Sequence, residues 1–144
     1  MTVPKFCEPA IQQKLDTGLV ALDVALTDKV FYMRAPDDES GPFVIIQKSQ
    51  RVNWRHINGP SGIAQSTLQI DSYHKTYLKS LTLDAQVESI LDGLKEIVSW
   101  GSDSPQDFVD IRGVSLQDSV DIIDQTDIPL LFRESTSYLV TYKQ

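Results

Sequence analysis

The chain has 144 residues, 41% of them hydrophobic and 23% charged, which is typical of a single globular domain spanning residues 1–144. Thirteen Lys and Arg against twenty Asp and Glu give a formal net charge of −7, which disfavours specific nucleic-acid binding because affinity for phosphates comes from cations. Uninterrupted apolar runs reach only four or five residues, whereas a membrane-spanning helix needs about 20. The single cysteine, Cys7, excludes an intrachain disulfide and fits synthesis in a reducing cytoplasm.

The first expected element is a helix that follows a flexible N-terminus, residues 1–8. Pro9 stands where a first helical turn tolerates proline, and the helix is expected to end at Asp28 and Lys29. A spacing of about 3.6 residues predicts one buried stripe, formed by Ile11, Leu15, Leu19, Leu22, Ala25 and Leu26. Residues 30–33 then predict a short strand, and residues 35–42 have the composition of a loop.

A long β-hairpin is expected next. Alternating apolar residues mark a strand from Phe43 to Trp54, whose far half is polar and basic, so residues 48–63 are expected to project beyond the core as an arm. Turn-forming residues occupy positions 58–62. The return strand is expected over residues 63–73. Its alternation predicts that Leu68 and Ile70 face inward and that Thr67, Gln69 and Asp71 face outward.

The second half of the chain predicts a helix over residues 75–94 and two further strands, around 114–122 and 134–142. The main stripe of this helix comprises Leu83, Val87, Ile90, Leu91 and Leu94. Residues 102–106 predict a polar loop, and residues 124–129 a turn. Short connections between successive strands favour antiparallel pairing. The expected class is therefore α+β, a mostly antiparallel sheet of four or five strands with two helices on one face and a long hairpin arm.

Catalytic and metal-binding patterns do not emerge from the sequence. The segment 59–62 lacks the lysine and the following helix of a phosphate-binding loop. Cys7, His56 and His74 are too few for a zinc site of four Cys and His ligands. His74 near Asp71 and Ser72 does not indicate a triad, because triads are defined by geometry. We expect a water-exposed His74, an unreactive Cys7, no enzymatic activity and no cofactor.

An acidic region spans residues 103–127, with seven aspartates, one arginine and a local charge of −6. It lacks the Asp-x-Asp-x-Asp-Gly spacing that places several ligands around one calcium ion. The acidic residues are therefore interpreted as a solvated surface and turn positions rather than as a metal site.

Two surfaces are candidates for contacts between subunits. Opposite the main stripe of the second helix lies a further apolar row, Leu78, Leu81 and Ala85, which either the first helix or another subunit must cover. The arm carries Arg51, Trp54, Arg55 and His56 near its tip. It is either a solvated hairpin or a basic contact for the acidic region of a neighbouring copy, and such a head-to-tail contact produces a ring when it closes.

The order of these patterns resembles the tail-completion, or tail-terminator, proteins of long-tailed bacteriophages with flexible tails. The resemblance extends from about Leu15 to the C-terminus, and each of its signatures is a packing or turn pattern. They are Val30-Phe31, Ala35-Pro36, Gly41-Pro42-Phe43-Val44, Gln69-Ile70-Asp71-Ser72-Tyr73, Thr76-Tyr77, Val87 with Leu91-Asp92-Gly93, and Tyr138-Leu139-Val140-Thr141-Tyr142. Asp84 within the core-facing stripe and Lys75 after the strand depart from the family pattern.

This resemblance implies a structural virion protein, made in the host cytoplasm, that forms a ring of six copies at the head-proximal end of the tail. The ring would terminate the tail tube and contact the tail-tube protein and the head connector, with DNA only as transiting cargo and no membrane contact. A lumen of like charge repels phosphates. We therefore expect acidic residues to line it: Asp103, Asp107, Asp110, Asp118 and Asp121, or the segment 37–39.

Three alternatives stay open. The nearest is a head-completion adaptor or stopper on the portal side. A small cytoplasmic protein-binding module would remain monomeric and bind no tube. A hydrolase would need a convergent polar pocket, for which the sequence offers no residues.

Overall fold

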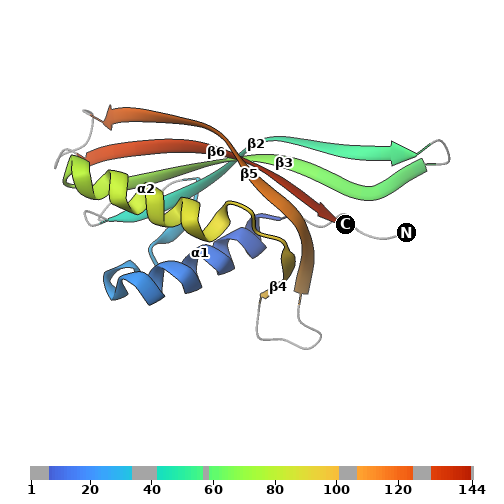
Figure 1. The fold of residues 1–144 in the computed structure, drawn as a ribbon, viewed down its shortest axis with the longest axis horizontal. Coiled ribbons are helices and arrows are strands. Elements are labelled where there is room, and N and C mark those ends of the chain that lie inside the picture. Colours follow the sequence, from blue (N-terminus) through green and yellow to red (C-terminus); the bar gives the residue numbers. More distant parts are fainter. Residues whose placement is uncertain (1–6, 34–41, 57–58, 101–106, 125–130, 144) are drawn as a thin grey trace.

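The computed structural model describes residues 7–33, 42–56, 59–100, 107–124 and 131–143, and only the backbone at residues 25, 49–56, 59–62, 99–100, 107–108, 120–124 and 131. In these ranges, two helices lie on one face of a six-stranded sheet (Figure 1). The expected α+β class is confirmed, with more strands than the four or five predicted. None of the described helices is long and apolar enough to span a membrane.

The first helix, α1, spans Glu8–Leu22 and has Pro9 in its first turn. Ala10, Ile11, Leu15 and Leu19 form its buried stripe, as the spacing predicts. The helix ends earlier than expected, so Leu22 does not continue the stripe and is 55% exposed. A short 3-10 turn, Val24–Leu26, then returns Leu26 to the core, and Asp28 adopts a positive φ of 56° before the first strand.

The sheet order is β1-β2-β3-β6-β5-β4. The short strand β1 pairs parallel with β2, and all other neighbours pair antiparallel, so the sheet is mixed. The bounds of the strands are β1 Val30–Tyr32, β2 Phe43–His56, β3 Gly59–His74, β4 Glu96–Trp100, β5 Asp107–Asp124 and β6 Leu131–Lys143.

The sequence prediction missed β4. We expected a helix as far as Leu94, with candidate stops at Asp92-Gly93 and at Trp100-Gly101. Helix α2 spans Tyr77–Leu91 and thus ends at the first of these stops. Gly93 then adopts a φ of 79° and donates its N–H to the carbonyl of Val114 at 2.9 Å, which redirects the chain into an edge strand. Of the β4 side chains described, only Val98 is buried, and Ile97 is 64% exposed. An edge strand with one buried residue produces no visible alternation.

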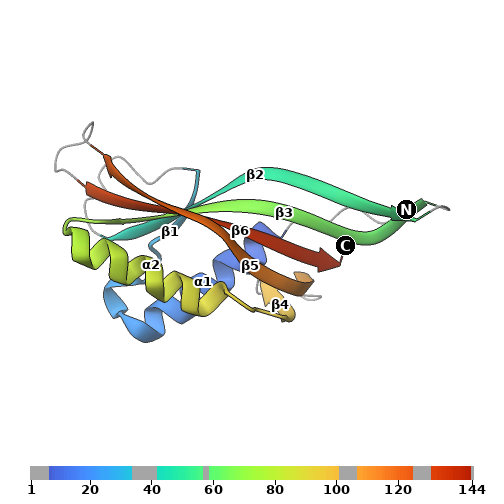
Figure 2. The same cartoon turned by 45° about the horizontal axis from the view of Figure 1, so that its top comes forward.

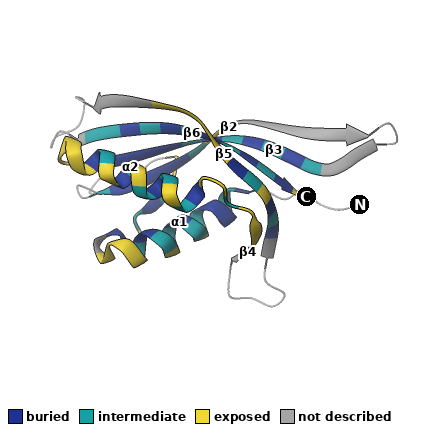
Figure 3. Ribbon diagram, viewed as in Figure 1, coloured by how far each residue is buried: buried dark blue, intermediate teal, exposed yellow. Residues whose placement is uncertain are grey.

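The core lies between the helices and the sheet. Leu83, Val87 and Leu91 of α2 and the α1 stripe form one buried cluster with inward residues of the strands, among them Leu68 and Ile70. Buried positions recur along both helices and along the strands (Figure 3). The helices approach each other closely at Gly18, where an added Cβ would lie 2.7 Å from Cδ1 of Ile90. Tyr138, Val140 and Tyr142, predicted on one parity of the last strand, are buried in the same core.

A smaller cluster occupies the opposite face of the sheet. Phe43 stacks on Tyr73 with ring centroids 4.6 Å apart, and Ile45 is buried beside them. Asp71 lies on this outward face, as its position in the alternation predicts, but it is buried there, with only 1% of its surface exposed. Its carboxylate accepts a hydrogen bond from Nε2 of Gln69 at 3.1 Å and lies 4.0 Å from Nη1 of Arg133, so an ion pair and a hydrogen bond compensate its burial.

The predicted hairpin arm is formed by the outer halves of β2 and β3, which extend together beyond the helices (Figure 2). The turn is shorter than expected, because Arg55 pairs with Pro60 and His56 with Gly59 inside the predicted turn 58–62. Strand pairing through Pro60 leaves only residues 57–58 between the strands, and these lie outside the described residues.

Candidate assembly surfaces

The outer row of α2 is not covered by α1. Leu78 is 70% exposed, Ala85 is exposed and Leu81 is half-buried. Helix α1 instead contacts α2 near Gly18 and Ile90, about three turns further along α2 than Leu78. A large apolar side chain such as Leu78 is thus available to another molecule.

Further apolar side chains are exposed at the same end of the helical layer. Leu22 and Val24, on either side of Asp23, are 55% and 77% exposed, and Tyr77 beside Leu78 is 41% exposed. The sequence placed Leu22 on the buried stripe and gave no role to Val24. The early end of α1 is what exposes them, and sequence spacing alone did not reveal that end.

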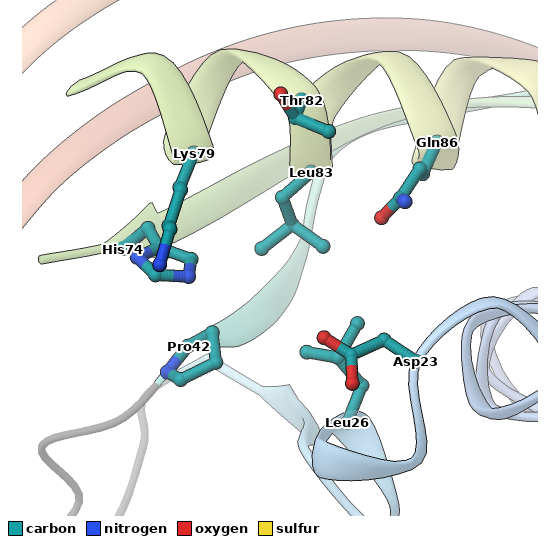
Figure 4. Close-up of a pocket in the computed structure, with 8 residues that line it drawn as sticks. All are labelled: Asp23, Leu26, Pro42, His74, Lys79, Thr82, Leu83 and Gln86. Atoms are coloured by element: carbon teal, nitrogen blue, oxygen red, sulfur yellow. The ribbon is translucent and has the colours of Figure 1, made fainter. Parts of the chain in front are cut away.

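An open cleft of about 250 Å³ lies between these two groups, lined by Asp23, Leu26, Pro42, His74, Lys79, Thr82, Leu83 and Gln86 (Figure 4). It is smaller than the 300–1,000 Å³ of usual ligand pockets. Its floor is apolar at Leu26 and Leu83, and charged groups stand at its sides.

His74 was predicted to be exposed to water, but it is half-buried in this cleft. Burial lowers the pKa of His74, and the positive charge of Lys79 lowers it further against the opposing effect of Asp23. Its Nδ1 is buried and has no hydrogen-bond partner among the described residues. The hydroxyl of Thr82 donates a hydrogen bond of 2.9 Å to the backbone carbonyl of Leu78. The cleft thus holds an imidazole with a lowered pKa, and the Thr82 hydroxyl in the same cleft donates to a helix carbonyl.

The other reactive groups do not converge. Asp71 lies on the face away from the helices, whereas Ser72 alternates to the helix-covered face, so these two residues and His74 do not form a triad. Cys7 is fully buried as the N-cap of α1 instead of lying in a mobile terminus, and Glu8 already belongs to the helix. Burial, together with the charge of Glu8, raises the pKa of the Cys7 thiol to about 12. The described residues contain no cluster of three metal-ligating side chains.

The arm residues named from the sequence all lie on β2. Arg51 pairs with Ser66, Arg55 with Pro60 and His56 with Gly59, while Trp54 lies at an irregularity in the ladder. Only the backbone of these four residues is described, and it places them toward the far end of the hairpin.

The acidic residues follow one strand. Asp107 and Asp121 lie near opposite ends of β5, and Asp103 is outside the described residues, as is the segment 37–39. Asp110 is half-buried and pairs with Arg112 at 3.0 Å. Asp118 is exposed and accepts a hydrogen bond from the backbone N–H of Ser119 at 2.8 Å. The described aspartates are thus distributed by their backbone positions along one strand.

Comparison with models of known protein families finds no match, and comparison with curated protein sequences finds none. Among solved structures, the chain is similar to a chain of the "Virion of native gene transfer agent (GTA) particle". The two have a TM-score of 0.63 and 14% sequence identity, over 93% of this chain and 92% of that chain. They share a fold. Because the overlap is nearly complete on both sides, the likeness includes the helical layer and the sheet together.

Proposed function

We propose that the chain is a structural subunit of a phage-like virion. The observation that carries this proposal is the shared fold with a chain of a gene transfer agent virion over almost the full length of both. Such a protein acts by the shape and chemistry of its surfaces.

The finer proposal is that the subunit forms a ring of six copies that terminates the tail tube and provides the surface for head–tail joining. The resemblance of the sequence to tail-terminator proteins supports this position in the virion. The exposed apolar side chains at one end of the helical layer support self-assembly, since exposed apolar groups gathered at one place mark contact sites.

Removal of this chain from its own virion-producing system tests the position. Electron microscopy is expected to show separate heads and tails, with tails of excess and irregular length. Purified protein added back should decorate the open ends of these tails. Tails of normal length and decoration of tail-less heads would assign the chain to the head-side adaptor, and normal joined particles would contradict both roles.

Substitution of Leu78 tests the helical contact. Leu78→Lys is expected to reduce the oligomer fraction in light scattering, because a charge would be buried at the contact. Ile97→Lys is the matched control, since Ile97 on β4 is exposed to a similar degree, 64% against 70%. Equal effects of the two substitutions would remove Leu78 from the proposed contact.

The proposed acidic lumen is tested with the aspartates at the start of β5 and before it. Asp103, Asp107 and Asp110 are replaced by Asn in particles that assemble normally. Slower DNA ejection is expected, because like charge repels phosphates during transit. Ejection at the original rate would exclude these residues from the lumen.

A further inference from the structure

Two long strand edges have no neighbouring strand on their outer side among the described elements. Strand β1 pairs with β2 only at Val44–Ile46, so beyond Gln47 no described strand adds to the outer side of β2 as far as His56. Strand β4 pairs with β5 only at Asp107–Ile111, and the N–H of Gly93 bonds Val114. From Ser115 to Asp124 no described strand adds to the outer side of β5. We call these the arm edge, residues 48–56, and the β5 edge, residues 115–124.

The first half of the β5 edge, residues 115–119, is also uncovered on its faces. Side chains of all five residues from Ser115 to Ser119 are exposed, including Leu116 at 38%, whereas the neighbouring strand β6 alternates between buried and half-buried. An exposed strand edge is a template for pairing with another strand, and isolated proteins usually shorten, cover or interrupt such edges. An interruption at Gln117 affects the ladder with β6, but most of the segment remains extended.

The topology determines how a second copy would fit. Because β2, β3, β6 and β5 alternate in direction, β5 runs antiparallel to β2 of the same chain. A neighbour in the same orientation would therefore bring its β2 antiparallel to β5 and continue the alternation. The arm edge lies at one end of the sheet and the β5 edge at the opposite end, on opposite sides (Figures 1 and 2). The neighbour would be displaced along the strands, which is the stagger that a closed sheet requires.

The charges of the two edges select this pairing. The arm edge contains Lys48, Arg51 and Arg55 and no acidic residue, whereas the β5 edge contains Asp118, Asp121 and Asp124 and no basic residue. Opposite charges favour arm-to-β5 contact, and like charges oppose arm-to-arm and β5-to-β5 contacts. A contact between two different surfaces is heterologous, so it propagates from subunit to subunit and closes into a ring when the rotation permits.

We infer that the arm edge of one copy adds as an antiparallel strand to the β5 edge of the next, so that the sheets join across the subunit contact. The inference rests on the proposed ring and adds a strand contact to the helical contact proposed at Leu78. It assigns Asp118 and Asp121 to the contact between subunits and leaves Asp103, Asp107 and Asp110 as candidates for the lumen.

Charge reversal in two separate variants tests the contact. The arm variant carries Arg51→Glu and Arg55→Glu, and the β5 variant carries Asp118→Lys and Asp121→Lys. In each variant alone, the arm and the β5 edge carry charges of the same sign, which repel each other. The protein concentration required for assembly, measured by light scattering, is therefore expected to rise about tenfold or more. An equimolar mixture is expected to assemble, because each arm then meets an edge of opposite charge, and a chain with all four substitutions is expected to recover.

The controls separate this contact from a folding defect and from nonspecific charge effects. Circular dichroism and urea unfolding establish that each variant folds. Lys75→Glu with Lys95→Glu reverses the same number of charges, at two exposed lysines that belong to neither edge, and is expected to leave assembly unchanged. Hydrogen exchange in the wild-type oligomer is expected to show new backbone protection at 48–56 and 115–124.

The outcomes distinguish the contact from the proposed function. Wild-type assembly with unaffected variants, a mixture that does not recover, or protection confined to the helices would overturn the strand addition while leaving the virion role intact. A wild-type chain that stays monomeric at all concentrations tested, and also in the presence of tails, would overturn both the strand addition and the proposed ring.

Discussion

Thr136 on β6 donates a hydrogen bond of 2.8 Å from its hydroxyl to the carboxylate of Asp84 on α2. Thr136 is fully buried, and the pair connects the helix to the centre of the sheet. Asp84 interrupts an apolar stripe in the sequence, and this contact explains its presence there, because a carboxylate near the core requires a donor.

A double-mutant cycle on this pair measures the contact. Thr136→Val preserves the volume but removes the donor, and is expected to lower the free energy of unfolding by about 1–2 kcal/mol. With Asp84→Ala, the two losses are expected to overlap by about 0.5–1.5 kcal/mol in urea denaturation, since both remove the same bond. Strictly additive losses would show that the bond does not contribute.

Gly18 provides the second prediction. A side chain there meets Ile90, so Gly18→Val is expected to destabilise the protein by roughly 1–3 kcal/mol through overpacking between the helices. Ile90→Ala creates space at the same point, and the double variant is expected to be more stable than the sum of the two single losses predicts. Thermal or urea unfolding checks this, and an unchanged stability of Gly18→Val would disprove the close approach.

The reactivity of Cys7 is the third prediction. With a pKa raised to about 12 by burial, the native thiol is expected to react with a disulfide reagent at pH 8 only as fast as the protein opens. The same thiol should react immediately in urea, and that reaction is the control. Rapid stoichiometric reaction of the native protein would show that Cys7 is not in the core.

The fourth prediction concerns pH. Because burial lowers the pKa of His74 in the folded protein, the unfolded chain binds the proton more readily. Stability is therefore expected to fall as the pH decreases through the ordinary histidine value of 6.5, and to continue falling until the folded-state pKa is passed. His74→Gln should remove this dependence between pH 7.5 and 5.5, whereas His56→Gln on the arm should retain it. An identical slope in His74→Gln would exclude His74 as its source.

Much of the fold follows from local patterns. The stripe through Leu15 and Leu19, the alternation at Leu68 and Ile70, and the last strand through Tyr138 are periodic over several residues. Periodicity of this kind reports which side of an element is buried, so the α+β class and the extended hairpin were predictable.

Elements without such a period were not predictable. Strand β4 buries Val98 but exposes Ile97, and its existence depends on β5, which follows it in the chain. The burial of Asp71 depends on Arg133, 62 positions away, and that of Cys7 on the packing of the sheet. No local pattern encodes a partner that distant.

The sequence by itself determined the class of fold, the opposite charges of the arm and of β5, and the lack of catalytic patterns, because composition and spacing are properties of the chain alone. Only the tertiary structure decided that Leu78 is exposed, that His74 lines a cleft, and that the two charged segments are strand edges at opposite ends of one sheet. The physical reason is that exposure and strand pairing depend on neighbours far along the chain, which folding alone brings together.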